Sequence, residues 1–285
     1  MDLNFIQAAV LGVVEGLTEF LPVSSTGHLT IAEKLLGLKI DAPAVTAYTA
    51  LIQVPAILAT FLYFGRKIIR LLTAWVRGLT HAEARTEHDY TLAWAVIVGS
   101  VPVGIVGFLG KSLIEGALRS LWVVAFALIL WSGVMWLAER RHDQLESSGR
   151  IRGEGDITVK DGLVLGIAQC ISLIPGVSRS GTTISAGLFQ GLSRVVATEL
   201  SFFMAIPALT AAGLYETLKS RHDLAGLGVG PIVVGMVVSF VVAYASIAWL
   251  LRFVATNSLR SFVTYRVVLG AAVVVALAAG WISAT

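Results

Sequence analysis

The sequence predicts an all-α polytopic membrane protein built from two inverted repeats, each a re-entrant helical hairpin followed by three transmembrane helices. Of its 285 residues, 56% are hydrophobic and only 14% are charged, whereas soluble chains have about 25% charged residues. The apolar residues lie in blocks of roughly twenty, the length of a helix that crosses a bilayer. These observations exclude soluble enzymes, nucleic-acid-binding proteins and secreted disulfide scaffolds, the last also because Cys170 is the sole cysteine.

Six segments are long and apolar enough to cross the membrane. They are residues 45–64, 91–110, 118–137, 200–218, 229–251 and 263–282. Nothing in them alternates with a period of two residues, which an outer-membrane β-barrel would require. All six crossings are therefore predicted to be helices.

Two further apolar stretches, residues 5–36 and 159–191, are interrupted near the middle by polar turns. The first turn is PVSSTG at 22–27, and the second is PGVSRSG at 175–181. Because each half is too short to span a bilayer, each stretch is predicted to be a re-entrant hairpin with its tip at membrane depth.

The two halves of the chain match when one is shifted by 154 residues. This shift places Glu15 on Gln169, Ser24 on Ser178 and Gly27 on Gly181. Three crossings reverse the side of the membrane, so the repeats are expected to be inverted, with both tips near the midplane. The predicted units are a first repeat at 1–138, a cytoplasmic linker at 139–158 and a second repeat at 159–285.

Ten basic residues in two loops set the expected orientation. They are Arg66, Lys67, Arg70, Arg77 and Arg85 after the first crossing, and Arg140, Arg141, Arg150, Arg152 and Lys160 between the halves. Surplus Lys and Arg mark cytoplasmic loops, and this surplus also explains the net charge of +3. Both termini, the mouth of the first hairpin, and Lys111, Arg119, Lys219 and Arg221 are then expected on the outer face.

The first hairpin carries two carboxylates, Glu15 and Glu19, on one face of a helix. A carboxylate in hydrocarbon costs at least about 2.5 kcal/mol, so a partner is required. Paired oxygen ligands suit Mg²⁺ or Ca²⁺, which accept water and phosphate as remaining ligands. The alternative is that both carboxylates merely accept hydrogen bonds from hydroxyls such as that of Thr18.

The polar tip that follows offers groups for binding and attacking an anion. Its residues are Ser24, Ser25, Thr26, Gly27 and His28. Free N–H groups at the start of the return helix favour a phosphate. His28 could take the proton of Ser25 or could itself be the nucleophile, and the spacing leaves both roles open.

The second tip places Arg179 among Ser178, Ser180 and Thr182. An arginine in an apolar segment is by default a clamp for phosphate or carboxylate. The alternative is an ion pair with Glu15 or Glu19 that holds the two repeats together.

Two long segments, EGLTEFLPVSSTGH at 15–28 and PGVSRSGT at 175–182, resemble the signature segments of the undecaprenyl-pyrophosphate phosphatase family, the BacA type linked to bacitracin resistance. The resemblance covers essentially the whole chain, including FVTYR at 262–266. It implies that Glu15 and Glu19 associate with a metal, that Ser25 and His28 form the nucleophile and base region, and that Arg179 binds phosphate.

The resemblance also implies an activity and a location. The expected reaction removes the terminal phosphate of undecaprenyl pyrophosphate and recycles the lipid carrier for peptidoglycan synthesis. The expected location is the bacterial plasma membrane, with the site facing the periplasmic or extracellular side. The partners are then a polyprenyl pyrophosphate and membrane lipids, without nucleic acid, and a homodimer stays open. Because transporters also use inverted repeats with re-entrant tips, a transporter or flippase of an anionic lipid is the alternative.

Overall fold

The computed structural model describes residues 3–284 except 41, 111–112, 114–115, 117, 119 and 220–226, and omits the side chains of 214 and 216–218. The described residues form helices, with one isolated β-bridge between Arg152 and Leu192. Lys111, Arg119 and Arg221, expected on the outer face, lie outside the described residues.

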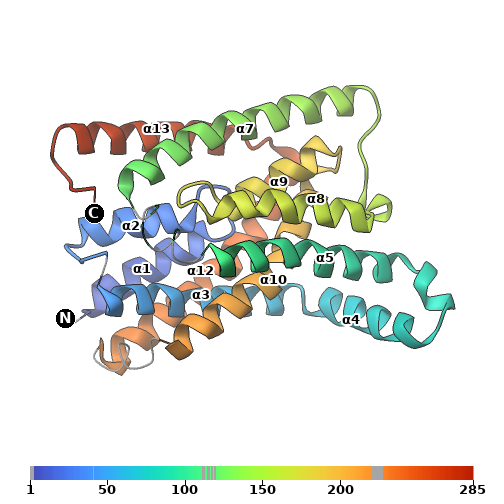
Figure 1. The fold of residues 1–285 in the computed structure, drawn as a ribbon, viewed down its shortest axis with the longest axis horizontal. Coiled ribbons are helices and arrows are strands. Elements are labelled where there is room, and N and C mark those ends of the chain that lie inside the picture. Colours follow the sequence, from blue (N-terminus) through green and yellow to red (C-terminus); the bar gives the residue numbers. More distant parts are fainter. Residues whose placement is uncertain are drawn as a thin grey trace.

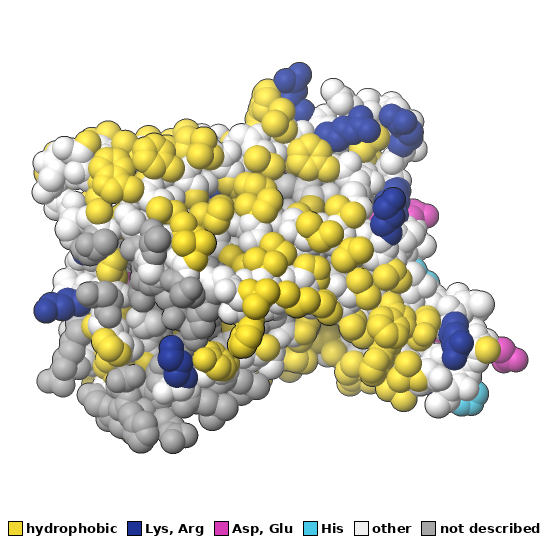
Figure 2. Space-filling view, in the orientation of Figure 1, with side chains coloured by type: hydrophobic (Ala, Val, Ile, Leu, Met, Phe, Trp, Pro, Cys, Tyr) yellow, Lys and Arg dark blue, Asp and Glu magenta, His cyan; other side chains and the backbone are white. Residues whose placement is uncertain are grey.

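Six of the described helices are long and apolar enough to cross a bilayer. They are α3 (Pro43–Tyr63), α5 (His88–Leu109), α7 (Leu121–Ser147), α10 (Arg194–Lys219), α12 (Val229–Thr256) and α13 (Arg260–Ala278). Large apolar side chains on them, such as Phe108 and Leu130, are exposed on the surface. Figure 2 shows hydrophobic side chains spread over the face of the molecule that it displays. The six segments predicted as crossings are thus confirmed as helices that could span a bilayer, as expected of a multi-pass membrane protein.

The two interrupted stretches form helix pairs that are too short to span. The first pair is α1 (Phe5–Thr18) and α2 (Ser25–Leu35). The second is α8 (Val159–Gln169) and α9 (Arg179–Phe189), with the 3-10 helix η3 (Cys170–Leu173) between them. The first pair opens toward the end of the molecule that holds both termini, and α8 starts from the opposite end (Figure 1).

Both helix pairs turn through the same strained backbone. Ser24 and Ser178 have φ values of +79° and +82°, and no other non-glycine residue in the described chain has a positive φ. Each serine caps the following helix, because its Oγ accepts the N–H of Gly27 or Gly181. Such a conformation costs about 1–3 kcal/mol and persists where the surroundings fix it.

Each short pair packs against a long helix from the other half of the chain. Helix α1 lies against α12, and α8 lies against α5. Glycines bring these backbones together, since a Cβ on Gly12 would collide with the carbonyl of Gly235, and one on Gly166 with that of Gly99. The tips are therefore held by contacts that cross between the halves.

The first basic segment differs from the prediction. The sequence predicts a loop after residue 64, but residues Gly65–Thr80 form helix α4. Its exposed apolar residues, Ile69, Leu72, Val76 and Leu79, recur at helical spacing and were obscured by the arginines between them.

The predicted linker at 139–158 also begins as helix, because α7 continues to Ser147. The short 3-10 helix η2 (Glu154–Asp156) follows, whereas η1 (Glu83–Thr86) precedes α5. Lys67 on α4 forms ion pairs of 2.6 Å with Glu154 and with Glu199 of α10. Both basic segments therefore lie at one end of the molecule (Figure 1).

Candidate active site

The first tip brings two buried carboxylates beside a serine. Glu15 is fully buried and Glu19 is 7% exposed. Glu19 follows the last residue of α1 with helical dihedrals, and its N–H donates to the carbonyl of Glu15. The two side chains therefore share a helix face, as their spacing predicts. Ser25, the first residue of α2, donates its hydroxyl proton to Glu19 Oε2 at 2.7 Å.

An ion pair joins the two tips. Arg179 Nη2 donates to Glu19 Oε1 at 3.1 Å, and Arg179 Nη1 donates to the carbonyl of Ser201 at 2.9 Å. Both side chains are largely buried, with exposures of 11% and 6%. The ion pair that the sequence left as an alternative to a phosphate clamp is therefore present. The buried guanidinium of Arg179 therefore contacts the same carboxylate that accepts the hydrogen bond of Ser25.

Glu15 is different, because neither of its buried carboxylate oxygens contacts a hydrogen-bond donor. Thr18, the hydroxyl considered for it, donates instead to the carbonyl of Val14 at 2.6 Å. An orphaned buried carboxylate one helical turn from a second carboxylate is the donor set of a hard divalent cation. Glu15 and Glu19 therefore fit such a metal.

His28 is held at both ring nitrogens. Nδ1 lies 2.7 Å from the carbonyl oxygen of Ser24, and Nε2 lies 2.7 Å from the hydroxyl of Tyr265 on α13. The two rings stack with their planes 13° apart. Within the described residues, Ser25 thus contacts Glu19 and His28 contacts Tyr265. Direct proton transfer from Ser25 to His28 is one of the two roles that the sequence leaves open for His28.

Arg266, the residue after Tyr265, ties both tips to the protein core. It is completely buried. Its guanidinium donates to the carbonyls of Pro22 in the first tip and Gly176 in the second, at 3.3 and 3.0 Å. Its Nε donates to Ser132 on α7 at 3.2 Å. FVTYR is part of the resemblance, but the sequence alone indicates no role for its last two residues.

The hydroxyls of the second tip donate to backbone carbonyls. Ser180 donates to the carbonyl of Leu21 at 2.9 Å, and Thr182 donates to the carbonyl of Ser178 at 2.7 Å. All three hydroxyl side chains of this tip are buried. By contrast, Thr26 of the first tip is exposed, and Ser25 and His28 are partly so. The surface from which an anion could enter is thus formed by the first tip.

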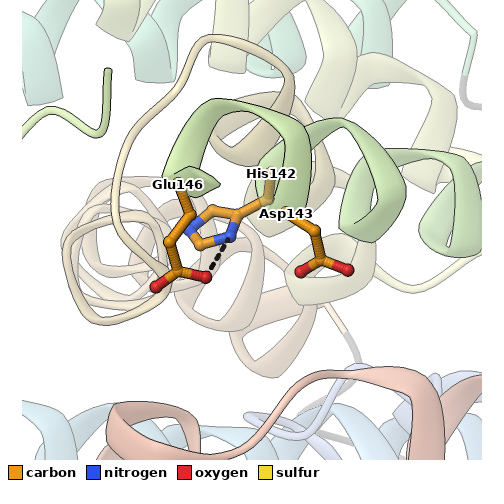
Figure 3. A group of neighbouring side chains, drawn as sticks. All are labelled: His142, Asp143 and Glu146. Carbon is orange, nitrogen blue, oxygen red and sulfur yellow. Dashed lines mark ion pairs between the residues drawn. The ribbon is translucent and has the colours of Figure 1, made fainter. Parts of the chain in front are cut away.

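A separate cluster at the end of α7 has the composition of a metal site. The ligand atoms of His142, Asp143 and Glu146 lie within 4.8 Å of one another (Figure 3). Asp143, however, is paired with Arg194 at 2.9 Å and with Arg260 at 2.5 Å. Both carboxylates of this cluster lie against arginines. At the first tip Glu19 also pairs with an arginine, but Glu15 has no partner, so the first tip has the stronger claim.

Comparison with known proteins gives one consistent family. The family model described as "Bacitracin resistance protein BacA" matches residues 8–272. A protein of Cutibacterium acnes named undecaprenyl-diphosphatase is 53% identical over 276 residues, which cover 94% of this chain and 95% of the relative. Undecaprenyl-diphosphatase 3 of Frankia casuarinae is 55% identical, over 99% and 100% of the two chains. An undecaprenyl-diphosphatase of Mycobacterium sp. (strain KMS) is 44% identical with the same coverage.

Proposed function

Because this chain belongs to the bacitracin resistance protein BacA family, we propose that it is a membrane phosphatase that hydrolyses undecaprenyl pyrophosphate to undecaprenyl phosphate and phosphate. The product is the lipid carrier that peptidoglycan synthesis uses again. The observation that carries this function beyond the resemblance is the chain of contacts from Ser25 through Glu19 to Arg179. It places a nucleophile, a proton acceptor and a phosphate-binding cation from two distant segments in one partly buried site.

Each side chain then has a role in phosphoryl transfer. Ser25 Oγ attacks the terminal phosphorus and gives its proton to Glu19, while the bond from that phosphorus to the bridging oxygen breaks. Undecaprenyl phosphate leaves with the bridging electrons. Water then attacks the phosphoserine, His28 Nε2 accepts a proton of this water, and the serine oxygen leaves and recovers its proton from Glu19. The net reaction consumes one water molecule.

The charge on the transferring phosphoryl group needs stabilisation by fixed donors. Arg179 supplies a guanidinium, and Ser24, Thr26 and Gly27 shape the helix start at which N–H groups face an anion. Ser178, Ser180 and Thr182 support the second tip that carries the arginine. Glu15 and Glu19 would hold Mg²⁺ or Ca²⁺, which when bound neutralises phosphate oxygens.

We also propose that the helix pairs are re-entrant hairpins of inverted repeats at 1–138 and 159–285. The shared Ser24 and Ser178 turns, the reciprocal packing of α1 on α12 and α8 on α5, and the opposite openings in Figure 1 support this architecture. The basic segments at one end favour a cytoplasmic position for that end. The first hairpin would then open to the periplasmic or extracellular side of the plasma membrane.

The orientation can be tested by thiol labelling in intact cells. In a Cys170→Ser background, Arg77→Cys and Arg150→Cys should resist a membrane-impermeant reagent, and Lys219→Cys should react. The opposite pattern would place the mouth of the first hairpin in the cytoplasm.

The activity is tested with the purified full-length chain in detergent. A polyprenyl pyrophosphate should release phosphate in the presence of Mg²⁺ or Ca²⁺, and EDTA should stop this release. The rival is a transporter or flippase of an anionic lipid, since secondary transporters also place binding sites between inverted repeats. Absence of phosphate release with every divalent metal, from folded protein, would favour that rival.

A further inference from the structure

Tyr265 reaches His28 from a helix 237 residues away along the chain. Their ring centroids are 5.6 Å apart and nearly parallel, and the phenolic oxygen lies 2.7 Å from Nε2. Tyr265 is 47% exposed. The hydroxyl of a half-exposed tyrosine can usually be satisfied by water or headgroups, so this directed contact requires its own explanation.

The contacts around His28 determine which ring nitrogen carries the proton. The carbonyl oxygen of Ser24 can only accept a hydrogen bond, so Nδ1 must be the protonated nitrogen. A neutral imidazole then has a bare Nε2, and the hydroxyl of Tyr265 donates to it. The unusual backbone of Ser24 serves the same arrangement, because its carbonyl accepts both the backbone N–H and the Nδ1–H of His28.

Tyr265 is itself fixed by its neighbour. Arg266, the next residue of α13, is buried and donates to groups on both tips and on α7. Four hydrogen bonds from one guanidinium, the fourth to the carbonyl of Ala127, hold this turn of α13 in register with the first tip. The phenolic hydroxyl consequently meets the imidazole at a defined position.

We propose that Tyr265 is a positioning residue for His28: the carbonyl of Ser24 fixes the Nδ1–H tautomer, and the hydroxyl of Tyr265 binds the basic Nε2 and holds it at the mouth of the first tip. This inference rests on the proposed function for the use that His28 makes of Nε2. Because this hydroxyl occupies the single lone pair of Nε2, a proton reaches Nε2 through it: the phenol passes its own proton to Nε2, takes one from the water, and then accepts a hydrogen bond from Nε2–H. One contact therefore supports His28 before and after proton transfer.

The variant Tyr265→Phe tests this role, because it keeps the stacked ring and removes only the hydroxyl. We expect kcat for phosphate release to fall about tenfold to a hundredfold, the equivalent of one or two hydrogen bonds, with KM changed less than about twofold. Tyr244→Phe is the matched control: Tyr244 is also half-exposed and packs its ring on Tyr63. Its variant should retain wild-type kcat and KM.

A spectroscopic readout separates positioning from simple support of the fold. In protein labelled with ¹⁵N-histidine, the His28 signals, identified by their loss in His28→Gln, should report Nδ1–H and bare Nε2. Tyr265→Phe should leave Nδ1 protonated, because the carbonyl of Ser24 remains, and should shift the Nε2 resonance downfield, because Nε2 loses its hydrogen-bond donor. If kcat and these signals are unchanged, or if kcat falls while the signals keep the wild-type pattern, the proposal is overturned. Because these signals are measured without substrate, they test Tyr265 even if wild-type protein releases no phosphate.

Discussion

The two tips share one backbone conformation but carry different functional side chains. Ser24 and Ser178 make the same turn and cap the next helix in the same way. At the next position, however, the first tip has Ser25 and the second has Arg179, and three residues later His28 corresponds to Thr182. The same geometry thus presents a serine hydroxyl and an imidazole in one tip, and a guanidinium and a buried hydroxyl in the other.

Burial follows the same division. The hydroxyls of the second tip are buried and donate to carbonyls of their own turn or of Leu21. The first tip keeps Thr26 exposed, and Ser25 contacts a carboxylate rather than a carbonyl. A duplicated turn therefore becomes a complete site only when its copies differ, with one copy reactive and the other a rigid support for the arginine.

The largest effect should come from exchanging a hydroxyl for a methyl group at each tip. Ser25→Ala should lower kcat at least about a thousandfold, because it removes the attacking oxygen. Ser180→Ala should keep kcat within about tenfold and lower the melting temperature, since the buried carbonyl of Leu21 loses its donor. Initial rates of phosphate release and thermal unfolding in detergent measure the two effects. Equal losses of kcat would erase the distinction between the tips.

The covalent intermediate sharpens the assignment at the first tip. Labelled substrate quenched in acid should leave an acid-stable phosphate ester on Ser25. An acid-labile, base-stable adduct on His28 would transfer the nucleophilic role to the imidazole and leave the function of the second tip unchanged.

The next effect concerns the ion pair between the tips. Arg179→Lys keeps a charge but loses the fork that reaches Glu19 and Ser201 together. We expect kcat to fall roughly a hundredfold, the usual cost of one oriented donor to a transition state, while the protein elutes from gel filtration as wild type. Turnover within a few fold of wild type would remove Arg179 from the site.

Arg266 should affect stability through both tips at once. Arg266→Gln removes buried charged hydrogen bonds to Pro22 and Gly176, and we expect a loss of about 3 kcal/mol in the free energy of unfolding. The exposed Arg252 on α12 provides the control Arg252→Gln, which should unfold as wild type. Denaturant unfolding of both variants measures this difference, and a stable Arg266→Gln would show that the tips hold each other without it.

The smallest effect distinguishes the starts of the two helix pairs. Helix α1 begins with a neutral capping box of Asn4 and Gln7, and α8 begins with one of Thr158 and Asp161. Burial alone would raise the pKa of Asp161, but hydrogen bonds from Arg152 and Thr158 outweigh it and lower this pKa below its usual range. Asp161 therefore stabilises the fold above its unfolded pKa, and this contribution disappears as the pH falls through the folded pKa.

The corresponding measurement compares two variants at two pH values. Asp161→Asn should cost roughly 1 kcal/mol at pH about 7, as loss of a cap does, and nothing in acid below both pKa values. Gln7→Ala should cost a similar or smaller amount that does not change with pH. A pH-independent penalty for Asp161→Asn would mean that the cap acts without its charge.

Much of this molecule could be predicted from the sequence, because long apolar blocks and polar interruptions are local signals. The six crossings and both breaks follow from them. The pairing of Ser25 could not be predicted, because the left-handed Ser24 turns the chain so that the hydroxyl meets Glu19 six residues earlier. Tyr265 and Arg266 contact the first tip across more than two hundred residues of sequence, and such contacts leave no local sequence pattern.

The reciprocal packing of the helix pairs also has a consequence for biogenesis. Helix α1 lies on α12, which ends only at Thr256. During translation, α1 and α2 are therefore made long before α12, the helix against which α1 packs. The second pair finds α5 already made. The α1–α2 pair, which carries the carboxylates, thus gains its packing partner later than the α8–α9 pair does. A chain truncated before α12 should leave α1 exposed to quality-control proteases.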